Sequence, residues 1–178
     1  MGLDQYLSKR TTVNNWMLTN ALESGLKPKI ILEDFPGIDV DQISGIIENV
    51  GSWRKCPAIH HWFVENIQHG EDDCKEYELG TEQLGELLQI CEDIWENYEE
   101  NSNNHGQPND EAKEYAEENL PNMEGFFFGN QEYDKDYFHW QIKPTIDMLK
   151  PLVEAEYGTT EDPLKPMFFS WYVYQSSW

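Results

Sequence analysis

The end of this chain limits its fold more than any other feature of the sequence. Residues 167–178 hold two phenylalanines, two tryptophans and two tyrosines in an almost uninterrupted apolar run. A free segment of this composition would aggregate, so it has to be docked in the core. We expect residues 167–175 to form a strand inside a small, mostly antiparallel sheet that helices cover.

Other segments have the composition or the period-two alternation of strands. Residues 4–8 are expected to form one, ended by the basic pair Lys9-Arg10, and residues 75–79 another. Residues 125–128 begin with a glycine, contain three phenylalanines and are followed by a second glycine, which favours a buried strand. A further strand is expected near 29–32, among proline and glycine breakers.

Residues 81–98 have the clearest helical pattern in the chain. Apolar residues recur on one face, whereas glutamate and aspartate cover the other. A shorter acidic helix is expected at 111–120. A longer helix is expected at 134–156, with breaks near Pro144 and Pro151, because proline lacks the N–H that an interior helical position needs.

Two further helices are expected to follow one another at 43–50 and 57–68 and to pack as a pair. In the first, isoleucine and valine recur at helical spacing. The second begins at Pro57, with Cys56 at its cap, and ends near Gly70. Its predicted apolar face consists of Ile59, Trp62, Phe63, Asn66 and Ile67.

These elements predict an α+β fold in a single domain, 1–178, with a mobile polar loop at 101–112. No stretch approaches the ~18 apolar residues of a membrane span, and the start lacks the pattern of a signal peptide, so a soluble intracellular protein is expected. Cys56, Cys74 and Cys91 show no CxxC spacing. Reduced thiols are therefore expected rather than disulfides or a zinc site.

The acidic residues are concentrated in the middle of the chain. Residues 65–136 carry 22 acidic side chains against three lysines, a net charge of −19, and the whole chain carries −22. Such a field repels nucleic acid and anionic membranes and attracts basic protein surfaces or cations. Two interpretations stay open: a solvated face that keeps the protein soluble, or a surface that imitates the phosphates of DNA.

A second candidate site lies in residues 53–74, which hold three of the five histidines and one of the two arginines. A guanidinium beside aromatic rings suits an anionic planar ligand such as a nucleotide, and the aromatic residues of the C-terminal strand are expected nearby. The alternative is a tryptophan-rich core in which Arg54 pairs with an acid. The predicted ligand-binding residues are Trp53, Arg54, Lys55, His60, Trp62, Tyr172, Tyr174 and Trp178.

The histidines do not predict a metal site. His60 and His61 are adjacent, so on a helix they point about 100° apart and cannot share one ion. His60 is expected at the rim of the core, hydrogen-bonded beside Phe63 and Val64. Neither a metal nor another cofactor is assigned.

Groups that could support catalysis are present, but no spacing links them. A metal held by the acidic run before Cys74 would lack the alternating oxygen ligands and central glycine of an EF-hand loop. A small hydrolase is therefore kept as a second alternative. Its candidate groups are Cys74 beside Asp72 and Asp73, His60 or His139 as base, and Arg54 as anion clamp.

Several short motifs are distributed over the whole chain. They are Met1-Gly2-Leu3-Asp4 with Tyr6-Leu7, Trp53-Arg54-Lys55, Ile59-His60 with Trp62-Phe63-Val64, Asp72-Asp73-Cys74 with Glu76-Tyr77, Gly125-Phe126-Phe127-Phe128-Gly129 with Tyr133-Asp134 and Tyr137, and Tyr174-Gln175-Ser176-Ser177-Trp178. Together they resemble a family of small proteins encoded by bacteriophages and prophages. The resemblance implies a viral accessory protein that acts on the host in the host cytoplasm, and it implies no catalytic residues.

These observations lead to three hypotheses about function. The first is an anti-defence protein that binds and sequesters a small phosphate-bearing signal, such as a nucleotide, without turning it over. The alternative is an acidic decoy that imitates DNA and binds a basic host protein, and the second alternative is the hydrolase. Direct binding of nucleic acid or membrane is not expected, and self-association into a homo-oligomer is left open.

Overall fold

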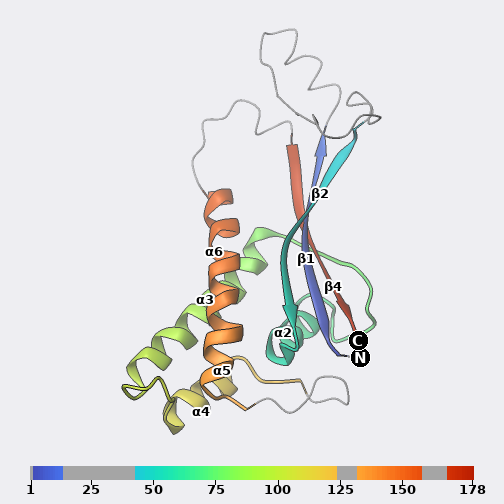
Figure 1. The fold of residues 1–178 in the computed structure, drawn as a ribbon. Coiled ribbons are helices and arrows are strands. Elements are labelled where there is room, and N and C mark those ends of the chain that lie inside the picture. Colours follow the sequence, from blue (N-terminus) through green and yellow to red (C-terminus); the bar gives the residue numbers. More distant parts are fainter. Residues whose placement is uncertain (1, 14–42, 124–131, 158–167) are drawn as a thin grey trace.

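Figure 1 shows the computed structural model of the chain. It describes residues 2–13, 43–123, 132–157 and 168–178. These residues form a four-stranded antiparallel sheet and four helices, where the continuous helical run 135–157 is counted as one helix. This arrangement confirms the expected α+β class. The strands expected near 29–32 and at 125–128 lie outside the described residues.

The sheet consists of β1 (Asp4–Val13), β2 (Gly45–Arg54), β3 (Tyr77–Leu79) and β4 (Phe168–Ser177). Its strand order is β2-β1-β4-β3, and each neighbouring pair is antiparallel. The C-terminal strand thus lies between β1 and β3, which confirms that the aromatic end of the chain is docked inside the sheet. The two termini lie together at one end of it (Figure 1).

Strand β1 is longer than the sequence indicated. Lys9 and Arg10 were expected to end the strand near residue 8, but both lie within it, and Arg10 pairs with Ile47 of β2 and Trp171 of β4. A strand with a partner on each side has its main-chain groups satisfied in both directions. Two charged side chains are therefore not enough to end it.

The predicted helix at 43–50 is wrong, because most of this segment belongs to β2. Ile46, Ile47 and Val50 have helical spacing, but they are β-branched and also suit a strand. A short apolar run does not decide between the two structures, and here pairing with β1 decides it. The expected pair of helices is therefore replaced by a strand that leads into a helix.

Helix α2 (Pro57–Asn66) begins as predicted, with Cys56 as N-cap and Pro57 in its first turn. It is not amphipathic, because seven of its ten residues are buried. His60 and Val64, outside the predicted apolar face, are buried, whereas Asn66, predicted within that face, is exposed. This helix therefore has neighbours on nearly every side.

Helices α3 (Thr81–Glu100) and α4 (Asp110–Asn119) confirm the two acidic helices. The helical run predicted at 134–156 is present as three continuous segments, α5 (Lys135–Tyr137), a π-helical turn η2 (Phe138–Ile142) and α6 (Lys143–Tyr157). The π turn ends two residues before Pro144, which has no N–H for the regular ladder. Pro151 lies within α6.

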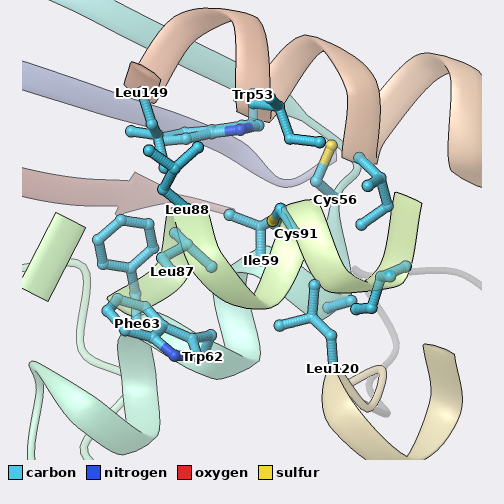
Figure 2. Close-up of a cluster of buried hydrophobic side chains, with 14 of the residues drawn as sticks. Trp53, Cys56, Ile59, Trp62, Phe63, Leu87, Leu88, Cys91, Leu120 and Leu149 are labelled. Carbon is cyan, nitrogen blue, oxygen red and sulfur yellow. The ribbon is translucent and has the colours of Figure 1, made fainter. Parts of the chain in front are cut away.

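The helices and the sheet share one core. Figure 2 shows side chains from β2, α2, α3 and α6 converging, among them Trp53, Phe63, Leu87 and Leu149. A side chain at Gly51 of β2 would overlap Met148 of α6, so this glycine permits the close approach of helix and sheet.

The loop between α3 and α4 is shorter than predicted, because α4 begins within the segment 101–112. Tyr98 donates a hydrogen bond to the carbonyl of Gly106 (2.7 Å), and Lys135 donates to the carbonyl of His105 (2.9 Å). These contacts tie the loop to α3 and α5. Within the described ranges, no helix has the length and apolar character to cross a membrane.

Candidate functional site

The structure divides the eight predicted ligand-binding residues into two groups. Five are buried and three are exposed, namely the two basic residues and Trp178, which is 37% exposed. The buried residues are Trp53, His60, Trp62, Tyr172 and Tyr174. The exposed basic residues are Arg54 and Lys55.

Arg54 lies at the end of β2, where its side chain is 76% exposed and its Nε is 3.6 Å from Oδ1 of Asp4. Lys55 follows in a left-handed main-chain conformation (φ 53°), and its N–H donates to the carbonyl of Leu3 (2.8 Å). The two positive charges therefore lie in solvent, while the aromatic residues with which they were expected to act lie in the core. A weak ion pair of Arg54 with an acid is the arrangement that the alternative interpretation predicted.

The buried aromatic residues pack around Phe63 of α2. Its ring stacks on Tyr174 of β4, with centroids 3.8 Å apart and planes 6° apart. Trp62 contacts it edge-on at 5.2 Å, and Trp53 lies 5.7 Å away. The indole N–H of Trp53 donates to Thr145 in α6 (2.8 Å). This arrangement is a packed core rather than a stacking platform for a ligand.

A buried polar network runs beside this aromatic core. His60 is fully buried, and its Nδ1 is 2.8 Å from the hydroxyl of Tyr174, which is also 3.0 Å from Oε1 of Gln5. Gln5 donates in turn to the carbonyl of Cys56, the cap of α2 (3.2 Å). The network thus connects β1, α2 and β4.

Asp72 extends the network to the surface. Its carboxylate is 14% exposed, with Oδ2 lying 3.1 Å from Nε2 of His60 and Oδ1 accepting a hydrogen bond from the indole of Trp178 (3.0 Å). The segment before β3 is therefore joined both to α2 and to the final residue. His60, Tyr174 and Trp178 are the predicted residues that the structure does bring together, and Gln5 and Asp72 are the partners that the prediction missed.

The protonation of His60 determines how this network is bonded. Burial lowers the pKa of His60, and this effect outweighs Asp72, which raises it. Neutral His60 that donates from Nε2 to Asp72 accepts at Nδ1 from Tyr174, and the single hydroxyl proton of Tyr174 is then not donated to Oε1 of Gln5. Charged His60 donates from both nitrogens, and Tyr174 then donates to Gln5. One hydroxyl proton therefore changes partner when the imidazole titrates.

The three thiols and the two histidines considered for a hydrolase lie in different environments. Burial raises the pKa of the Cys56 thiol to about 12 and also raises that of Cys91, which disfavours reactive thiolates. His139 is held by Tyr98, with its Nε2 3.0 Å from the hydroxyl, whereas His60 belongs to the network described above. Cys74 is partly exposed, and the structure links it to neither histidine by any hydrogen bond that it describes.

The two aspartates before Cys74 also have different partners. Asp73 forms an ion pair with Lys75 (2.5 Å) and accepts a hydrogen bond from Tyr77 (3.1 Å), and the Lys75 contact lowers the pKa of Asp73. Asp72 is directed to His60 instead. Across the described ranges, no three His, Cys, Asp or Glu side chains come together as metal ligands.

The acidic surface is formed mainly by α3 and α4. Together these helices carry twelve acidic residues and one basic residue, Lys113. Along α3 six exposed polar residues recur every three or four positions and form one stripe, whose length is about 27 Å at 1.5 Å per residue. They are Glu82, Glu86, Gln89, Asp93, Glu96 and Glu100.

Helix α4 extends this surface. It packs on α3 with Ala112 and Ala116 buried, and its five acidic residues are all exposed. Glu92 lies off the stripe and pairs with Lys150 of α6 (2.9 Å). We call the stripe and the exposed acids of α4 the acidic face. The apolar and acidic faces expected at 81–98 predicted the part on α3, and the short acidic helix expected at 111–120 corresponds to the part on α4.

Comparisons of the chain with protein family models, with curated proteins and with solved structures gave no match. The resemblance to proteins of bacteriophages and prophages therefore stays a prediction. The case for function depends on the geometry of the chain itself.

Proposed function

We propose that this chain is a binding protein whose acidic face docks on a basic protein surface that otherwise binds nucleic acid. The observation that carries the proposal is the stripe along α3, where five exposed acids follow one side of a helix that contains no basic residue. The resemblance to phage proteins adds a context, in which such a decoy would disarm a DNA-binding protein of the host.

The charge pattern supports a linear polyanion as the shape that is imitated. The five charges of the stripe are separated by three, four or seven residues, because Gln89 is uncharged, which is about 4.5 to 10.5 Å along the helix. Phosphates in one DNA strand have an axial spacing of ~3.4 Å, so the stripe imitates a line of negative charge at lower density. The acids of α4 add a second set beside it. A field of one sign over such a surface also accelerates encounter with a basic partner.

The phosphate-bearing small ligand is a less supported proposal. Its binding site was expected to combine Arg54 and Lys55 with aromatic rings, but the rings of Trp53, Trp62 and Tyr174 pack in the core. The two exposed cations remain as its support. Arg54→Ala is therefore a useful reference variant, because it would weaken binding of a phosphate-bearing ligand and leave the acidic face unchanged.

The proposal is tested by competition with DNA. Purified bacterial DNA-binding proteins, each bound to a fluorescent duplex, would be titrated with the chain while anisotropy reports release of the duplex. We expect release from at least one of them, and we expect it to weaken as salt rises, because exposed charges are screened over a Debye length of about 8 Å at 0.15 M.

Two charge-matched variants locate the surface. The triple variant Glu86→Gln, Asp93→Asn, Glu96→Gln removes three charges from the stripe, and Glu48→Gln, Glu65→Gln, Glu154→Gln removes three exposed charges outside the acidic face. We expect the first to abolish release and the second and Arg54→Ala to preserve it. Equal loss in both triple variants, or no release by the parent chain, would show that the acidic face has no such role.

A further inference from the structure

A groove beside β4 has no place in the proposed function. Strand β3 pairs only with Tyr172, Val173 and Tyr174, so β4 extends beyond it. At Gly80 the chain leaves the sheet and begins α3, and its N–H is held there by the side chain of Gln83 (2.7 Å). This cap prevents β3 from continuing along β4.

The departure of the chain leaves an open edge. Residues 168–171 of β4 pair with β1 on one side. On the other side, no strand in the described part of the chain pairs with them. Four residues of strand measure about 13 Å, and alternate residues along that length direct main-chain groups to the open side. An unpaired edge of this kind is a template for another extended chain.

The groove along this edge has a volume of about 890 Å³. Phe169 and Trp171 are aromatic residues of its lining from β4, and their rings lie 5.7 Å apart. Glu78 and Glu82 line it from the segment that enters α3. Among the described residues, ten line the groove, and they include two acids and no base, so this lining favours a positively charged occupant.

Trp171 gives a second indication of a missing partner. Its indole nitrogen is buried and has no hydrogen-bond acceptor within the described ranges. A buried donor without an acceptor is unfavourable, and such groups usually have a partner when a protein is in its functional state. A carbonyl from a bound main chain would supply this acceptor.

We propose that this groove binds an extended, basic peptide segment of a partner protein, which adds to the sheet as a strand beside residues 168–171 of β4. Main-chain hydrogen bonds to the open edge hold the peptide. Glu78 is the direct partner of Val173, so it lies on the same face of the sheet as Phe169 and Trp171. On that face Glu78 forms ion pairs with the lysines or arginines of the peptide, and the two rings contact the same side chains through cation–π interactions. The groove shares only Glu82 with the stripe of α3. Peptide binding in the groove can therefore be present or absent whether or not the acidic face binds a basic protein.

The probe is a fluorescein-labelled hexapeptide of alternating lysine and valine, compared with the same peptide of alternating glutamate and valine. We expect saturable binding of the first only. Phe169→Ala and Glu78→Lys should each weaken it about tenfold, the effect of losing roughly one good contact. Phe169 is 69% exposed and Glu78 is exposed, so both variants are expected to fold, and a melting curve checks this.

Matched controls separate the groove from general charge attraction. Trp140→Ala removes an aromatic side chain that is 74% exposed on η2, and Glu114→Lys makes the same charge change on α4. Both should bind the lysine–valine peptide as the parent does. If Glu114→Lys weakened binding as much as Glu78→Lys, the peptide would be held by overall charge, and the groove would not be its site.

Methylation of the peptide main chain tests strand addition directly. In an extended peptide, N–H groups of alternate residues point to opposite edges, so N-methylation at positions 1, 3 and 5 blocks one edge and at 2, 4 and 6 the other. We expect one methylated form to lose binding and the other to retain it. The indole N–H signal of Trp171, assigned by its loss in Trp171→Phe, should shift only with peptides that bind. Equal binding of both methylated forms would overturn the proposal.

Discussion

Helices α2 and α3 begin in similar ways and have opposite surroundings. Each starts at a turn that leaves a strand, with a capping residue and an apolar pattern in its sequence. In α2 seven of ten residues are buried, whereas α3 buries six of twenty and exposes six acids. Apolar spacing thus identifies a face that must be buried, but it does not say whether the opposite face is also covered.

The cover over α2 comes from the chain termini. Gln5 and Tyr174 bond to the network around His60, and Asp72 with Trp178 closes it from the solvent side. The outer face of α3 consists of charged residues that are fully hydrated, so burying it would be costly without a partner of opposite charge. Stability should therefore be concentrated around α2 and β4, and the acidic face should contribute little of it.

The largest expected effect follows from deletion of residues 174–178. It removes the ring stacked on Phe63 and the part of β4 that pairs with Asp4–Leu7 of β1. We expect loss of the cooperative transition in urea or a strong tendency to aggregate, because the core would be opened. Removal of Ser177 and Trp178 alone is the control and should leave a folded protein. A chain without 174–178 that melted at the parent temperature would contradict a docked terminus.

Of the single substitutions considered in α2 and α3, Phe63→Ala should lower the free energy of unfolding most. The side chain is fully buried between Trp62, Trp53 and Tyr174. The lost contacts and the cavity should lower the free energy of unfolding by about 3–5 kcal/mol, measured by urea denaturation. Trp140→Ala, an exposed aromatic, should stay within about 0.5 kcal/mol of the parent. Similar losses in both would mean that α2 is not the centre of stability.

Tyr174→Phe keeps the stacked ring and removes only the hydroxyl. The buried Nδ1 of His60 then loses its hydrogen-bond partner, and Oε1 of Gln5 also loses one when His60 is charged. We expect the free energy of unfolding to fall by about 1–3 kcal/mol. Tyr6→Phe on the exposed part of β1 is the matched control, and equal stability of the two variants would indicate that the network contributes nothing.

The network should also make stability depend on pH. Because the pKa of His60 is lowered in the folded chain, the unfolded chain takes up a proton at a higher pH than the folded one. The contribution of His60 is therefore complete above its unfolded pKa, about 6.5, and decreases as pH falls from there toward the folded pKa. Urea midpoints measured between pH 5 and 8 should show this decrease in the parent and a flatter profile in His60→Gln. An identical slope in both would contradict it.

The smallest effect is expected on the acidic face. Glu96→Gln removes an exposed charge from a helix surrounded by like charges, and the free energy of unfolding should change by no more than about 0.5 kcal/mol, with stabilisation as the expected sign. Equilibrium urea titration at low salt is the sensitive measurement. A loss of more than 1 kcal/mol would show that α3 has a structural partner on its outer side.

The structure confirmed the predictions that rested on a long periodic pattern or on a segment too apolar to remain in solvent. The apolar face of α3 recurs over five turns, so its period is unambiguous, and the C-terminal segment is too apolar to remain outside the core. The segment 43–50 was too short for its period to be decisive, and its β-branched residues suit both structures. For the candidate ligand site, the sequence identified His60 and Tyr174 but not Gln5 or Asp72, which lie 169 and 102 positions away from Tyr174.

The sequence by itself therefore determined the charge distribution, the identity of α3 and α4, and the need to bury the C-terminal strand, because each depends on residues close together in the chain. Only the tertiary structure decided that 45–54 is a strand, that α2 is buried on nearly every side, and that β4 extends beyond β3 with an edge that no strand in the described part of the chain covers. These features depend on which distant segment lies alongside, and that choice follows from the packing and main-chain hydrogen bonds of the whole fold rather than from any local period.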